Sequence, residues 1–184
     1  MEKLTKLEDR LFGASRISNL QKLKQEYAGY ISLLQQEVSL AKSHANRLRT
    51  QAYDENGNLT MNAYAGNAGV GYLHFDSKGN LENGREIELA LLNKLNDATA
   101  AYNANRYDEN TSSWYSDRVD DAKKNYDGFM KAMQEYQDTL GKIEEGENQI
   151  QEYQQKIQDA ADEIIDSIQE GIEGIIEAID SQRD

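Results

Sequence analysis

Residues 126–182 read YDGFMKAMQEYQDTLGKIEEGENQIQEYQQKIQDAADEIIDSIQEGIEGIIEAIDSQ, and their apolar residues recur in alternating steps of three and four. That spacing is typical of a helix that packs along a second helix. No proline interrupts it, because the chain contains none. We therefore predict a long heptad helix over residues 114–184. Its predicted packing seam comprises Tyr126, Phe129, Met133, Tyr136, Leu140, Ile143, Ile150, Ile157, Ile164, Ile168 and Ile175, with Glu147, Gln154, Ala161, Gly171 and Ala178 at the remaining positions.

A first long helix is predicted over residues 1–50, and its clearest part spans 19–49. Its apolar residues also fall on one face, at steps of three or four. Lys and Arg side chains here contrast with the acidic C-terminal helix, so we predict antiparallel pairing oriented by weak exposed ion pairs. The apolar face comprises Leu20, Leu23, Tyr27, Ile31, Leu34, Val38, Ala41, Ala45 and Leu48, and the basic residues are Lys22, Lys24, Lys42, Arg47 and Arg49.

The pattern changes over residues 51–83, which are rich in Gly, Asn and aromatic residues. Residues 53–59 and 75–81 are near repeats of aromatic-Asp-x-x-Gly-Asn-Leu. Each repeat places a glycine where a tight hairpin requires a positive φ. We predict a small β-hairpin insertion here, with residues 62–71 as a flexible loop or a surface that another backbone approaches.

A third helical segment is predicted over residues 84–105, with Ile87 and Leu91 on its inner face, followed by a polar turn over 106–113. Leu4, Leu7 and Leu11 already follow helical spacing close to Met1. The apolar pattern of the last helix also runs to the end of the chain. We therefore interpret the sequence as one elongated domain, a fragment of a longer chain cut through helices at both ends.

The composition agrees with a mainly α fold, namely an elongated antiparallel coiled-coil hairpin or helical bundle with the β-hairpin insertion. Only 38% of the residues are hydrophobic, below the roughly 45–50% of compact domains. The formal net charge of −13 disfavours nucleic acid as a partner, because such binding uses clustered Lys and Arg. No signal segment and no apolar run of about 18 residues is present, so no membrane insertion is expected.

Few residues are candidates for chemistry. The chain has no cysteine, and neither histidine belongs to a recognised metal motif. We expect a structural or surface role for His44. His74 with Asp76 is only a weak candidate for a metal or acid–base pair, which we discount because no nucleophile and no orienting group accompany it. The turn at Asp54 resembles part of a calcium loop, but its glycine is misplaced and the closing Glu is absent. We therefore predict no catalytic, cofactor-binding or metal site.

The isoleucines near the C-terminus cover a wider face than a two-helix seam requires. Ile165, Ile172, Ile176 and Ile179 broaden the stripe, which predicts a further helix partner. That partner is either a second copy, giving a homo-oligomer through the C-terminal helix, or the rest of a parent chain. Acidic residues on the polar face argue against a membrane-surface role.

The order of these segments resembles stretches of very large bacteriophage virion proteins. The resemblance rests on the long helix, the Tyr53-Asp-Glu-Asn-Gly-Asn turn, segment 83–103, the Trp114-Tyr115 corner and segment 120–127. Tail tape-measure proteins and the internal or cargo proteins of crAss-like phages carry such stretches. The resemblance implies an extended α-helical module located in the virion. No functional residue carries over from it.

We therefore expect a structural, non-catalytic coiled-coil module of a larger assembly. The alternative is a secreted helical-hairpin protein of the type VII kind. Against it, Trp114-Tyr115-Ser116 departs from Trp-x-Gly, and Tyr72 with Asp76 matches Tyr-x-x-x-Asp only in a predicted strand. An enzyme is the least favoured class. If the phage resemblance does not hold, we expect a soluble protein whose compartment the sequence does not fix.

Overall fold

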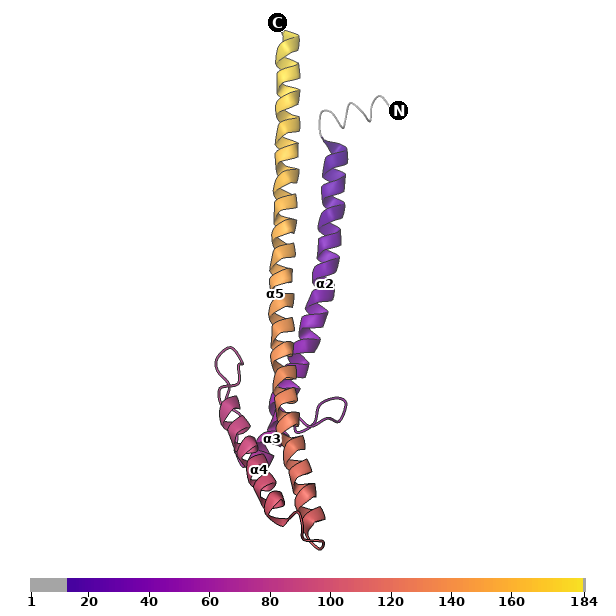
Figure 1. Cartoon of the computed structure of the whole chain (residues 1–184). Coiled ribbons are helices and arrows are strands. Elements are labelled where there is room, and N and C mark those ends of the chain that lie inside the picture. The colour runs from indigo at the N-terminus through magenta and orange to yellow at the C-terminus, as the bar shows by residue number, and fades with distance from the viewer. Residues whose placement is uncertain (1–12, 184) are drawn as a thin grey trace. The chain divides into compact units, whose positions relative to one another are not determined.

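The computed structural model describes residues 13–183 and is mainly helical (Figure 1). Helix α2 spans Ala14–Thr50, α3 spans Met61–Ala68, α4 spans Gly84–Asn105 and α5 spans Ser112–Arg183. The mainly α prediction is confirmed. The helical spacing of Leu4, Leu7 and Leu11 lies outside the described residues.

The chain divides into two compact units, and each is described by itself. Residues up to Val38 and from Glu145 onward form the first, here called the paired-helix unit. Residues Ser39–Glu144 form the second, here called the core unit. Helices α2 and α5 each contribute one segment to each unit.

In the paired-helix unit, α2 and α5 run antiparallel. The rings of Tyr27 and Tyr153 stack with centroids 5.5 Å apart, and the Arg16 guanidinium lies 3.7 Å from the Glu163 carboxylate. Higher residue numbers on α2 thus pair with lower residue numbers on α5, as antiparallel helices require. Both Arg16 and Glu163 are exposed, so this ion pair contributes little stability, and burial of the helix faces has the larger role.

The buried positions of α5 in this unit are occupied by small residues. Ala160 and Ser167 are buried there, and so are Gly146 and Gly171. A Cβ atom placed on Gly146 would come within 2.5 Å of Cγ2 of Val38. The two helices therefore approach closely at positions that a search for large apolar residues overlooks.

The core unit contains the large buried side chains. Two come from α5, two from α4 and one from α3, and each is almost completely shielded from solvent. The cluster is completed by smaller or neighbouring side chains, namely Ala45, Leu48, Ala65, Ala68 and Ala132. Burying such side chains is worth roughly 1.5–3 kcal/mol each, so this cluster dominates the stability of the unit. The five are Phe129, Tyr136, Ile87, Leu91 and Met61.

The predicted β-hairpin insertion over residues 51–83 is wrong. Within residues 13–183 there is no strand, and the insertion contains only two isolated antiparallel bridges, Tyr53↔Leu59 and Phe75↔Leu81. Between them lies helix α3 instead of the expected loop. Each bridge closes a loop whose amides bond to an Asp side chain, so no ladder of strand hydrogen bonds develops.

Helix α3 forms because its residues suit a helix better than their small size suggested. Met61, Ala65 and Ala68 are buried at a helical spacing of four and three, and alanine has the highest helix propensity. Gly69 ends the helix in the left-handed conformation with φ of 79°. Its amide and that of Val70 donate to the carbonyls of Gly66 and Ala65, 3.0 Å away in both cases.

Candidate interaction surfaces

Two loops in the core unit share one hydrogen-bond pattern. In the first loop, residues 53–59, Oδ1 of Asp54 accepts from the amides of Asn56 and Asn58 at 2.8 and 2.9 Å. In the second loop, residues 75–81, Oδ1 of Asp76 accepts from Lys78 and Asn80 at the same two distances. Gly57 and Gly79 have φ of 80° and 84°, which confirms the predicted positive φ at both positions.

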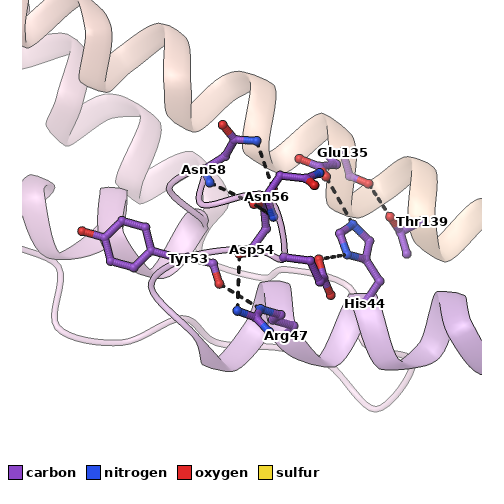
Figure 2. Close-up of polar contacts among 9 residues, drawn as sticks. His44, Arg47, Tyr53, Asp54, Asn56, Asn58, Glu135 and Thr139 are labelled. Carbon is purple, nitrogen blue, oxygen red and sulfur yellow. Dashed lines mark hydrogen bonds and ion pairs between the residues drawn. The ribbon is translucent and has the colours of Figure 1, made fainter.

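The first loop is tied to α2 and α5 by polar contacts (Figure 2). Nδ1 of His44 lies 2.7 Å from a Glu55 carboxylate oxygen, and Nε2 lies 3.2 Å from one of Glu135. Arg47 donates to the carbonyls of Tyr53 and Asp54 at 3.1 and 3.4 Å. Through these contacts with two carboxylates, His44 joins α2, the first loop and α5.

The second loop is instead held by aromatic packing. The ring of Phe75 meets that of Tyr136 edge-on, with centroids 5.6 Å apart. The Tyr136 hydroxyl donates to the carbonyl of Gly79. The Arg49 guanidinium lies 5.8 Å from the Phe75 ring centroid. Arg47 and Arg49 therefore contact the two loops, whereas their charge had predicted pairing with acidic residues of the last helix.

The hydrogen bonds in the loops determine how their acids titrate. The backbone N–H of Asn58 lowers the pKa of Asp54, and the backbone N–H of Asn80 lowers the pKa of Asp76, because each donates to the ionised carboxylate. The pKa of Glu55 is lowered by its own amide and then by His44, while burial raises the pKa of Tyr136. These carboxylates are held ionised by local donors, which suits a structural role better than proton transfer near neutral pH.

Metal binding finds no support in the described part of the chain. Across residues 13–183, no cluster of three or more His, Asp or Glu side chains is placed to hold an ion. The Asp54 carboxylate accepts three hydrogen bonds from its own loop. The His74 amide donates to Oδ1 of Asn83 at 2.9 Å, and the Asp76 carboxylate bonds to Lys78 and Asn80 rather than to His74.

The predicted seam residues of α5 occupy three environments. Phe129 and Tyr136 are fully buried. Ile168, predicted as a seam residue, is 47% exposed, which corrects its assignment. Every other position of the seam lies one residue earlier than predicted. Ala160 is buried instead of Ala161, and Ser167 instead of Ile168, so Ile168 turns away from α2. The half-buried members are Tyr126, Met133, Leu140, Ile143, Ile150, Ile157, Ile164 and Ile175.

Within residues 13–183, the isoleucine stripe is a conspicuous apolar surface of the paired-helix unit that no described residue covers. We define it as Ile168 together with the four residues that the sequence proposed as a partner stripe. Their exposed fractions range only from 47% to 53%, although isoleucine is a residue usually found inside proteins. Spacings of three, four, four and three place them on one face of α5. The stripe comprises Ile165, Ile168, Ile172, Ile176 and Ile179.

An open cavity of about 590 Å³ lies beside Trp114 in the core unit. The Trp114 ring meets Tyr115 edge-on at 4.8 Å and lies under the Arg118 guanidinium at 4.6 Å. Lys94, on the cavity wall, donates to the carbonyl of Asn67 at 2.7 Å. The sequence indicated a corner at Trp114 and Tyr115 but not this cavity, although Trp114 and Arg118 are four residues apart and so share a helix face.

Comparison of the chain with known protein families, curated proteins and solved structures finds no match. Within residues 13–183, none of the helices combines the length and the apolar character needed to cross a membrane.

Proposed function

We propose that the chain is a structural, non-catalytic helical module that packs against other proteins in a larger assembly. The isoleucine stripe is the observation that supports this most directly. Five half-exposed isoleucines on one helix face form an apolar surface of the kind that marks protein interaction sites. Each is solvated at a cost that a packing partner would remove.

The assembly that we propose is a bacteriophage virion, with the chain acting as a tape-measure-like or internal protein. The support is the resemblance in segment order together with the predominance of helices. The loop acids support a non-catalytic role, because their hydrogen bonds hold them in the ionised state.

Particle purification tests this proposal. An epitope-tagged copy expressed during phage growth should band with assembled particles in a density gradient and resist high-salt washing. A tagged protein of unrelated fold provides the control for trapping. Recovery of the tagged chain only in the soluble fraction would contradict a virion role.

The type VII alternative gains no observation in its favour. Tyr72 and Asp76 lie between α3 and α4, outside any helix, whereas the alternative requires the Tyr-x-x-x-Asp pair in a helical hairpin. In addition, Ser116 stands at the position of the glycine in the Trp-x-Gly motif. We therefore keep the assembly module as the proposed function.

A further inference from the structure

The isoleucine stripe has one acidic border. Asp162 and Glu173 each precede a stripe residue by three positions, and Asp180 follows Ile176 by four, so these acids are neighbours of the stripe on the helix surface. None of the three forms an ion pair with another residue in the described 13–183 range. From Ile157 to Gln182 the chain carries eight acids and no Lys or Arg, the acids being Asp159, Asp162, Glu163, Asp166, Glu170, Glu173, Glu177 and Asp180.

This charge pattern selects among the possible occupants of the stripe. A second copy docked tail to tail would bring acids against acids, and like charges across a helix interface are unfavourable. A membrane surface rich in anionic lipid would be repelled by the same acids. A helix with an apolar stripe bordered by Lys or Arg satisfies both the isoleucines and the acids.

We propose that the stripe Ile165–Ile179 binds a cationic amphipathic helix of a partner protein. Burial of the isoleucines supplies the affinity, and the acids bordering the stripe select the charge and orientation of the incoming helix. The inference deepens the proposed function and rests on it, because it names the chemistry of the partner in the assembly.

The test measures binding of a synthetic helical peptide to the full chain by fluorescence anisotropy. The probe is about four heptads long, with Ile and Leu on one face and Lys along its borders. A matched control peptide has Glu in place of every Lys. We expect the Lys peptide to bind at least about tenfold more tightly than the Glu peptide at low salt, and to weaken as salt rises. Equal binding of the two peptides would overturn the proposal.

Variants locate the site. The double substitution Ile172→Asp with Ile176→Asp should weaken the Lys peptide at least about tenfold, since it places charge in the apolar face. The control pair Leu33→Asp with Leu40→Asp makes the same change at exposed positions on α2 and should leave affinity within about twofold. Circular dichroism checks that both variants remain helical. Unchanged binding by the isoleucine variant would overturn the proposal.

Two further measurements test the charge preference and the identity of the occupant. Changing Asp162→Asn, Glu173→Gln and Asp180→Asn together should weaken the Lys peptide about threefold or more and leave the Glu peptide no weaker. Light scattering that shows a concentration-dependent dimer, abolished by the isoleucine variant, would make a second copy the occupant and overturn the proposal. If the chain bands with particles but does not bind the Lys peptide, the proposed function stands and this inference is overturned.

Discussion

Helix α5 buries different residues in its two segments. In the core unit it buries large side chains, with Phe129 and Tyr136 fully shielded. In the paired-helix unit its buried positions include Gly146, Ala160 and Ser167, while isoleucines of the same segment are half exposed. One segment is therefore stabilised mainly by buried area. The other packs through close backbone approach, and the side chains of its isoleucine stripe stay half exposed.

The largest expected effect is in the core unit. Phe129→Ala should lower the free energy of unfolding by about 3–5 kcal/mol, because it removes a fully buried ring and leaves a cavity. Denaturant unfolding followed by circular dichroism measures the change. Ile179→Ala, at a half-exposed position of the same helix, serves as the control and should cost less than about 1 kcal/mol. Similar losses in both variants would contradict the described burial.

Close approach in the paired-helix unit can be tested with one methyl group. Gly146→Ala should destabilise by about 1–3 kcal/mol, because the new Cβ would meet Cγ2 of Val38. Gly141→Ala is the matched control on the same helix, since a Cβ there meets no atom within 4 Å, and it should stabilise by up to about 1 kcal/mol.

A compensating change makes this comparison sharper. Combining Gly146→Ala with Val38→Ala should restore part of the lost stability, because the smaller residue frees the space that the methyl group needs. A double-mutant cycle measures the coupling between the two positions. Strictly additive effects would show that the helices are not in contact there.

A smaller effect should appear as pH dependence in the core unit. The pKa values of Asp54 and Asp76 are lowered on folding, so the unfolded chain binds more protons at acidic pH. Their stabilising contribution is therefore complete above the unfolded pKa near 3.9 and is lost as pH falls through the lower folded values. Asp54→Asn with Asp76→Asn should flatten the decrease in the melting temperature below about pH 4.

The control for the pH experiment removes equal charge outside the loops. Asp162→Asn with Asp180→Asn changes the net charge by the same amount on an exposed face of α5. If both double variants gave the same pH profile, the effect would come from net charge and not from the loop hydrogen bonds.

The smallest expected effect concerns the isoleucine stripe. Ile172→Asp with Ile176→Asp should change the free energy of unfolding of the isolated chain by less than about 1 kcal/mol, because both side chains are half exposed. Thermal melting monitored by circular dichroism measures this. A large loss of stability would show that the stripe is a buried face, which would remove its availability to a partner.

The parts of the fold that follow from periodic apolar residues were predictable. Ile87 and Leu91 mark the inner face of α4 from the sequence, and the structure buries both. Gly146, Ala160 and Ser167 were not found, because small residues carry no hydrophobic signal and their role depends on the distance to a second helix. Helix α3 was missed for a related reason, since its buried faces are made by alanines and one methionine.

The interaction surfaces were only partly predictable. The width of the isoleucine pattern indicates a partner from sequence, but half exposure is a property of the folded unit. The near repeat at Asp54 and Asp76 predicted turns with positive φ, yet the bonding of each carboxylate to its own loop depends on three-dimensional geometry. The cavity beside Trp114 requires α4 and α5 to be placed side by side, which no short motif specifies.

The first and second loops also differ in their susceptibility to deamidation. The first loop contains Asn56 followed by Gly57, whereas the second has Lys78 before Gly79. An Asn-Gly sequence deamidates when the glycine backbone nitrogen attacks the side-chain carbonyl carbon of the asparagine, which releases ammonia. In the folded loop that nitrogen donates to the Asp54 carbonyl at 3.2 Å, a hydrogen bond that disfavours this attack. Deamidation at Asn56 is therefore expected to be slower in the folded loop than in the unfolded chain.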